Sequence, residues 1–167
     1  LVLDAIFLYP KKNSQGIKET IQIGSNEEGD NIEIEGFYLN DDQLIFTSEK
    51  PYVIYGYMAI PSDKKAIFEA GSRLYFHENS GIIVANNASI SINGELSNNP
   101  EKMEGEVIFQ GDRLEPEYDN IPGQWGTVWL TFGSKNHIIN NLTIKNASIG
   151  ILVDGGGNSA NESLILR

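Results

Sequence analysis

The sequence predicts an all-β fold, and within that class a right-handed parallel β-helix, from three observations. Gly accounts for 17 of the 167 residues and Asn is frequent, which suits many turns between short strands. Stretches with helical period are missing. Apolar triplets recur at a spacing near 22 residues, about the length of one three-sided coil, because three short strands and three turns fill that many positions at ~3.3 Å per residue.

The first 50 residues differ from the rest of the chain in the pattern of their apolar and polar segments. Short apolar or alternating segments are separated there by polar loops, at residues 5–9, 20–23, 31–35 and 44–46. The end of a solenoid needs cover, because an open strand edge invites aggregation. We therefore expect a small N-terminal β module or cap at residues 1–50 and the first coils of a pectate-lyase-like solenoid at residues 51–167.

Two kinds of recurrence support the coils. Residues 67–69 and 90–92 are 23 positions apart, and Leu142 and Leu164 are 22 apart, which predicts stacking between coils. Within a coil, triplets follow one another at eight or nine residues: 74–76, 82–84 and 90–92, then 142–144 and 151–153.

The outer residues of each triplet are expected in the core and the middle one on the surface. This places Leu142, Ile144, Ile90 and Ile92 inside, and Thr143 and Ser91 outside. The triplet at 82–84 fits less well, because it is apolar throughout.

A jelly roll or β-sandwich is the alternative fold, since it also gives short strands at spacings of about 8–12 residues. The spacing near 22 favours the solenoid. Its repeat opens again at residues 164–166 with no cap, so the chain is expected to continue beyond residue 167.

Charge and composition exclude several classes of function. A net charge of −11 and a pI near 4.5 disfavour binding to nucleic acid and adsorption on anionic lipid. The absence of Cys excludes disulfide frameworks, thiol nucleophiles and zinc–thiolate sites, and fits a bacterial extracytoplasmic solenoid. No stretch approaches the 18 apolar residues of a membrane-spanning helix.

The segment 110–120 interrupts the strand rhythm and is the most distinctive candidate site. It carries four carboxylates, from Asp112, Glu115, Glu117 and Asp119, with Arg113 expected to pair with one of them. Several oxygen ligands on one loop suit calcium, although the spacing matches no EF-hand or nonapeptide repeat. A structural loop and a partner-binding surface are the other interpretations.

Trp125 and Trp129, with Tyr118 and Phe132, form the second candidate. Aromatic rings beside carboxylates suit sugar binding, whereas the alternative is that both indoles pack against the coil or under the loop.

The two histidines, His77 and His137, are 60 residues apart without ligand-like neighbours, so no catalytic residue and no metal ligand is assigned. Four glycosylation-like acceptors are better explained as turn residues, because Asn tolerates a left-handed backbone: Asn87, Asn141, Asn146 and Asn161.

Six segments form a distinctive set: EAGSRLYFH (69–77), GIIV (81–84), GDRLEP (111–116), IPGQWG (121–126), NASIGI (146–151) and the lead-in YVIYGY (52–57). Through these segments, about two-thirds of the chain resembles the parallel β-helix surface lipoproteins of Bacteroidota-type bacteria, mostly of unknown function. The resemblance implies an extracytoplasmic protein of the cell surface or outer membrane. It also implies a lipid anchor on an upstream Cys that this sequence does not contain.

We expect a non-enzymatic cell-surface protein that binds an outer-membrane protein or a glycan, or serves as a structural subunit of an outer-membrane complex. The alternative is a carbohydrate-active enzyme, a polysaccharide lyase or hydrolase, with catalytic coils downstream. Either enzyme needs clustered carboxylates. Lys145 and Arg167 end the two strands aligned by sequence, which argues against a stacked acidic site, and Asp154 precedes a glycine run that suits a cleft or a loose turn.

Overall fold

The computed structural model describes residues 4–25, 27–154 and 164–166. Strands dominate, and the helical elements of these residues are two 3₁₀ turns, η1 (Asp41–Gln43) and η2 (Pro116–Tyr118). The all-β class is therefore confirmed. Over the same residues, no helix is long and apolar enough to cross a membrane.

The strands form three sheets, which we number in chain order. Sheet 1 contains β1 (Ile6–Leu8), β5 (Tyr52–Ile54), β8 (Arg73–Phe76), β11 (Val107–Gly111) and β14 (Leu142–Ile144). Sheet 2 contains β2 (Thr20–Ser25), β3 (Asn31–Tyr38), β6 (Tyr57–Ile60), β9 (Gly81–Val84), β12 (Val128–Leu130) and β15 (Ile151–Val153). Sheet 3 contains β4 (Ile45–Phe46), β7 (Lys65–Glu69), β10 (Ser89–Asn93), β13 (His137–Asn140) and β16 (Leu164–Leu166).

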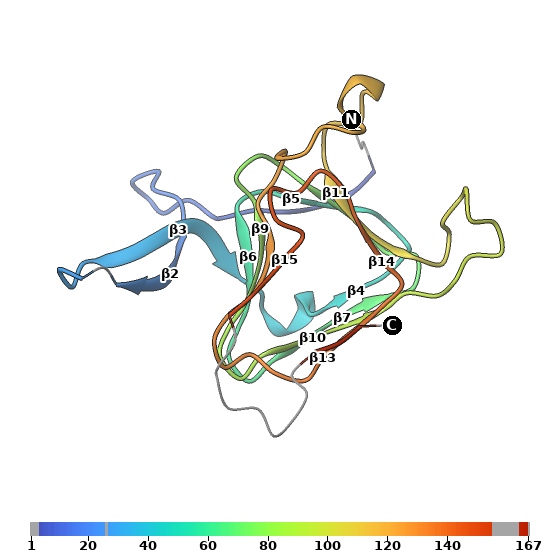
Figure 1. Ribbon diagram of the computed structural model, residues 1–167. Coiled ribbons are helices and arrows are strands. Elements are labelled where there is room, and N and C mark those ends of the chain that lie inside the picture. The colour runs from blue at the N-terminus through green and yellow to red at the C-terminus, as the bar shows by residue number, and fades with distance from the viewer. Residues whose placement is uncertain (1–3, 26, 155–163, 167) are drawn as a thin grey trace.

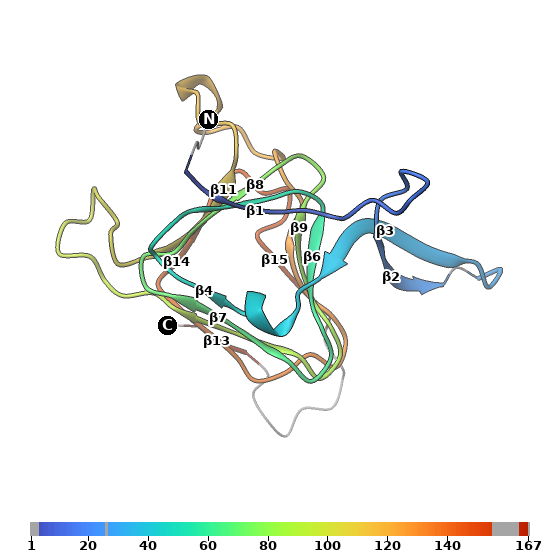
Figure 2. The same cartoon turned by 180° about the vertical axis from the view of Figure 1, so that it is seen from behind.

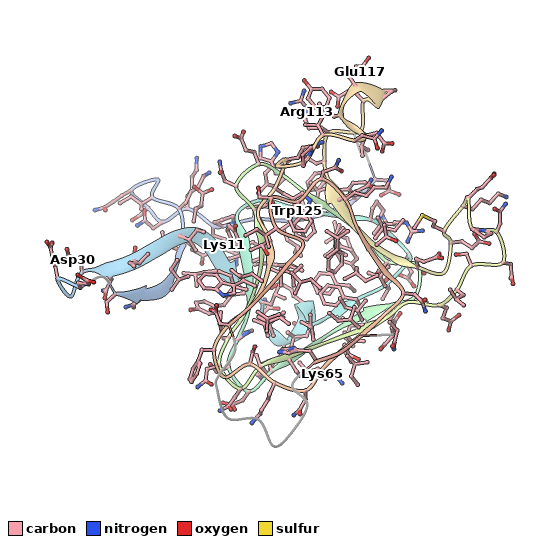
Figure 3. All side chains as sticks on the ribbon, in the orientation of Figure 1. Lys11, Asp30, Lys65, Arg113, Glu117 and Trp125 are labelled. Carbon is pink, nitrogen blue, oxygen red and sulfur yellow. The ribbon has the colours of Figure 1, made fainter. Side chains whose placement is uncertain are left out.

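From β5 onward the chain visits sheets 1, 2 and 3 in turn, so each strand pairs with the strand three places further along. Every named pairing is parallel except that of β2 with β3. The sheets lie along the three sides of a triangle (Figure 1). Side chains from all three sheets point into the space between them (Figure 3).

The core follows from strand alternation. In β7 the side chains of Ala66 and Phe68 are buried, and in β11 those of Val107 and Phe109 are buried, while the residues between them are half-buried. Aromatic rings connect neighbouring layers: Phe46 stacks on Phe68 at 4.5 Å between ring centroids, and Phe68 meets Phe109 edge-on at 5.3 Å. Contacts across layers of this kind let a stack of short strands share one apolar interior.

The triplets predicted at 74–76, 82–84 and 90–92 coincide with β8, β9 and β10, one in each sheet. Residues 142–144 and 151–153 coincide with β14 and β15. Leu142 and Ile144 pack against the core, as predicted, while Thr143 is half-buried.

Two predicted registers are wrong. Ile67 pairs with Ser91 rather than Ile90, because the spacing there is 24 residues and not 23. Leu164 pairs with His137 in sheet 3, whereas Leu142 pairs with Val107 in sheet 1. The 22-residue interval between the two leucines therefore does not mark paired strands. Connections of unequal length separate the strands of successive layers, so a constant interval does not identify the partners.

Ser91 was predicted on the surface and is 5% exposed. Its small side chain lies in the row between Ile67 and Ile138, which its pairing places on either side. Ile90 and Ile92 are fully buried, as predicted.

The N-terminal segment contributes an end strand to each sheet. β1 pairs with β5, β3 with β6 and β4 with β7, all in parallel. Figure 2 shows β1 and β4 at the near end of their sheets. β2 adds an antiparallel partner to β3, and this hairpin projects beyond the triangle (Figure 1). That residues 1–50 form a separate module stays a prediction.

Asparagines at turns have the backbone that was predicted for them. Asn87, Asn141 and Asn146 have φ values of 60°, 46° and 64°, in the left-handed region that Asn tolerates better than most residues. Asn161 and the glycine run after Asp154 lie outside the described residues.

Candidate functional site

The segment 110–120 projects from one corner of the triangle, with Arg113 and Glu117 on it (Figure 3). Three of its carboxylates contact three different basic side chains: Asp112 contacts His77 at 2.7 Å, Glu115 contacts Arg113 at 3.7 Å and Asp119 contacts Lys145 at 3.3 Å. The predicted pairing of Arg113 with a neighbouring acid is confirmed. No group of three or more His, Asp or Glu side chains that suits a metal ion occurs among the residues that the structure describes.

Trp125 lies inside the core and Trp129 outside it. The indole of Trp125 is 1% exposed, stacks on Phe76 and donates a hydrogen bond from Nε1 to the carbonyl of Lys145 at 2.8 Å. Trp129 is half-buried, and its Nε1 donates to Asp154 Oδ2 at 2.6 Å. The two indoles therefore do not form one aromatic surface, and that of Trp125 offers no face to a ligand from solvent.

The other two aromatic residues of that candidate group are also apart. The ring of Tyr118 is covered by the Arg113 guanidinium, 3.8 Å from the ring centroid. Phe132 is 69% exposed on the turn after β12.

His77 and Asp112 resemble part of a catalytic relay. The Asp112 carboxylate bonds Nδ1 of His77, whose ring lies 4.8 Å from that of Tyr55. The nearby Ser80 hydroxyl, however, donates to the backbone carbonyl of His77 and not to its ring. A relay needs the nucleophile bonded to the histidine ring, so this corner is better described as a polar support for the turn.

A cleft of about 480 Å³, which we call the Tyr57 cleft, opens on the outer face of sheet 2. Ile34 and Glu35 of β3 form one wall, and Tyr57 of β6 contributes to the lining. The turn between β8 and β9, with Glu78, and the segments 123–127 and 148–149 complete it.

The hairpin wall is held by apolar packing. Ile21 of β2 is 2% exposed and packs with Ala59 and Ile83 in a small cluster distinct from the main core. This explains the all-apolar triplet at 82–84: Ile82 and Val84 face the interior, while Ile83 supports the hairpin on the outer face. Apolar packing therefore joins the hairpin wall of the cleft to the outer face of sheet 2.

Glycines make room for the Tyr57 ring. A Cβ at Gly81 would lie 2.5 Å from Cε1 of Tyr57, and a Cβ at Gly126 would collide with its hydroxyl. The Tyr57 ring can lie this close to the backbone of residues 81 and 126 only because glycine has no side chain. Burial also raises the pKa of the Tyr57 phenol above its usual value.

One wall of the cleft carries a buried hydroxyl with no partner. Thr127 is 9% exposed, and no described residue bonds its Oγ1. Across the cleft, one carboxylate oxygen of Glu35 accepts a hydrogen bond from Lys18 Nζ at 2.6 Å. Glu78 is exposed at the rim.

A second cavity of about 580 Å³, the Phe7 pocket, shares Glu35 with the cleft. It is lined mainly by aromatic and cationic side chains, those of Phe7, Tyr9, Tyr55, Lys12 and Lys18. Phe7 is 44% and Tyr9 57% exposed, so the pocket presents aromatic surface to solvent. The two cavities flank the same strand, β3.

Neither cavity was found from the sequence. Their residues come from segments that become neighbours only when strands from different layers pair. A usable signal was Gly81 at the start of an apolar strand, since Gly in a strand often marks the close approach of another group. The predicted residues Asp112, Glu115, Glu117, Asp119 and Trp129 do not line either cavity, and Trp125 borders the cleft with its side chain buried.

Comparisons with family models, with curated proteins and with solved structures find no match to this chain.

Proposed function

We propose that the chain is part of a right-handed parallel β-helix. Three parallel sheets visited in a fixed order, with each strand paired to the strand three places later, support this architecture. The right hand is supported by the general preference of parallel strands for right-handed crossovers. The resemblance to surface lipoproteins agrees with this architecture, and on that basis we propose a location outside the cytoplasm, on an outer membrane.

On this scaffold the protein is a non-enzymatic binding protein of the cell surface, and its ligand is a glycan. The observation that carries this function is the pair of cavities that flank β3 and share Glu35. Concave sites with aromatic walls and a few polar groups are typical of ligand binding. Phe7 and Tyr9 also favour binding, because these exposed rings line the same pocket and grouped apolar surface of this kind is typical of interaction sites.

A carbohydrate-active enzyme is the second candidate, because Glu35 and Glu78 both line the Tyr57 cleft. Glycoside hydrolysis uses a pair of carboxylates. Against this, one oxygen of Glu35 already accepts a hydrogen bond from Lys18. Release of new reducing ends from a bound glycan would favour the enzyme, and unchanged glycan after prolonged incubation favours binding alone.

A glycan microarray with neutral and acidic oligosaccharides tests the binding function. We expect the unmodified chain to bind a subset of glycans. The double variant Phe7→Ser/Tyr9→Ser should bind that subset more weakly, because it removes the exposed rings of the Phe7 pocket. The matched control is Leu96→Ser, which changes a residue that is 82% exposed on the connection between β10 and β11. No signal above background for any glycan would refute the proposed function.

A further inference from the structure

We infer that the Tyr57 cleft binds one neutral pyranose unit of a glycan, with the apolar face of the sugar on the Tyr57 ring and its hydroxyls bonded to Thr127 and Glu78. This inference rests on the proposed function and assigns a ligand class to one of its two cavities.

The first argument is the shape of the floor. The Tyr57 ring occupies space left by Gly81 and Gly126 and remains half-exposed in the cleft. A pyranose presents a face of C–H groups, and an aromatic ring gives that face an apolar surface of similar extent. The cleft, at about 480 Å³, falls within the ~300–1,000 Å³ of small-ligand sites.

The second argument is the Thr127 hydroxyl. A buried hydroxyl without a hydrogen bond is destabilising, and such groups in native proteins call for an explanation. Thr127 belongs to the same outward-facing row as Gly81 and Tyr57 and lines the cleft. The hydroxyl is closed to solvent in this structure, and rotation of the Thr127 side chain about χ1 would turn it toward a ligand hydroxyl in the cleft, which would supply the missing partner.

The third argument is charge. Glu35 and Glu78 line the cleft, and no Lys or Arg lines it among the described residues. Lys18, which pairs with Glu35 at 2.6 Å, lines the neighbouring Phe7 pocket instead, so Glu78 is the carboxylate of the cleft for which no ion pair is seen among the described residues. The protein as a whole carries a charge of −11. A carboxylated or sulfated sugar would therefore be repelled, whereas carboxylates accept hydrogen bonds from neutral sugar hydroxyls well. The ligand class is a neutral hexose unit.

The experiment is calorimetric titration of the chain with neutral hexasaccharides built from glucose, mannose or galactose, and with a hexauronate. Thr127→Val removes only the hydroxyl and keeps the branched shape. Tyr57→Leu removes the ring and keeps an apolar side chain. The matched control is Thr143→Val on β14, in another sheet.

At least one neutral hexasaccharide is expected to bind. Its Kd should rise about tenfold in Thr127→Val, the equivalent of one hydrogen bond, and more in Tyr57→Leu. Thr143→Val should leave the Kd unchanged. Thr127→Val should also keep or raise the urea concentration at which half of the protein is unfolded, because it removes an unpaired buried hydroxyl. Weaker binding by this variant would then not be explained by a loss of folded protein.

Two results would overturn the inference while leaving the proposed function standing. One is binding of the hexauronate in preference to every neutral sugar. The other is neutral-sugar binding that Phe7→Ser/Tyr9→Ser abolishes and that neither cleft variant changes. If no glycan binds in either experiment, the inference and the proposed function fail together.

Discussion

Trp125 and Phe76 stack with ring centroids 4.2 Å apart and planes 14° apart, although one follows a long projecting loop and the other ends a regular strand. The indole N–H also bonds the carbonyl of Lys145 in the next layer. One side chain thus connects the loop to two layers of the core. This makes the loop part of the packed interior at its base, even though its tip is exposed.

Trp125→Ala is expected to destabilise the fold by about 3–5 kcal/mol, because it leaves a cavity where a fully buried ring stood. Trp125→Phe retains an aromatic ring and loses the N–H bond, so its effect should be smaller. Urea denaturation of both variants measures the difference. Equal losses in the two variants would mean that the ring itself adds nothing beyond the hydrogen bond.

Stability should fall between pH 6.5 and pH 4 through His137, which is 2% exposed. Its Nδ1 accepts the N–H of Ile90 at 3.3 Å, and its other ring nitrogen bonds the Ser134 hydroxyl at 3.0 Å. Burial lowers the pKa of His137 to about 4, from an unfolded value of about 6.5. Between these values the unfolded chain takes up a proton that the native state rejects.

The contribution of His137 is therefore fully present above about pH 6.5 and is lost as the pH falls toward 4, by at most about 3 kcal/mol. Because carboxylates also titrate in this range, the measurement is the difference in unfolding free energy between the unmodified chain and His137→Gln at several pH values. A difference that stays constant from pH 7 to pH 4 would contradict the prediction.

Asn146 should stabilise the base of the projecting loop in two separable ways. Its φ of 64° suits Asn or Gly, and its Nδ2 donates to the carbonyls of Tyr118, Asp119 and Ile121. Asn146→Gly keeps the backbone freedom and loses the amide, whereas Asn146→Ala loses both. We expect Ala to be less stable than Gly by about 1 kcal/mol.

Hydrogen exchange checks the loop in these variants: residues 118–121 should exchange faster in both, since both lack the amide. Slow exchange in Asn146→Gly would show that the backbone conformation alone holds the loop.

Arg73 should hold the connection between β10 and β11. Its guanidinium donates to the carbonyl of Met103 at 2.5 Å and of Glu106 at 2.6 Å, and to those of Gly71 and Ser72. Arg73→Lys keeps the charge but cannot reach several carbonyls at once with one ammonium group. We expect a loss of about 1–3 kcal/mol and faster limited proteolysis within residues 95–105. Cleavage at the unmodified rate would argue against this role.

The sequence was sufficient to predict strands wherever short triplets follow one another at eight or nine residues, as at 74–76 and 82–84. It was insufficient for register. A spacing of 24 instead of 23 residues moves the partner of Ile67 from Ile90 to Ser91 and exchanges the two faces of the strand. The composition of the turns does not reveal such a difference of one residue.

The candidate site was less predictable, for a physical reason. Asp112, Glu115 and Asp119 lie within eight residues of one another, yet each pairs with a different basic side chain. Glu115 and Asp119 line a small pocket of about 190 Å³ that Asp112 does not line, so proximity along the loop brought only two of the three carboxylates together. Glu35, Tyr57 and Thr127 lie far apart in sequence and become neighbours in the cleft through strand pairing and the space left by glycines. Locating them required the register that the spacing alone did not provide.

The two long connections, 94–106 and 112–127, indicate where the fold accepts inserted residues. β5 and β8 pair Tyr52 with Leu74, 22 positions later, whereas β8 and β11 pair Leu74 with Phe109, 35 positions later. The added residues leave the sheet by separate corners, and the strands resume parallel pairing behind them (Figure 1). Insertions in the projecting parts of these connections are therefore expected to leave the strand pairing intact, whereas the base of the second connection, with Trp125 in the core, has to stay as it is.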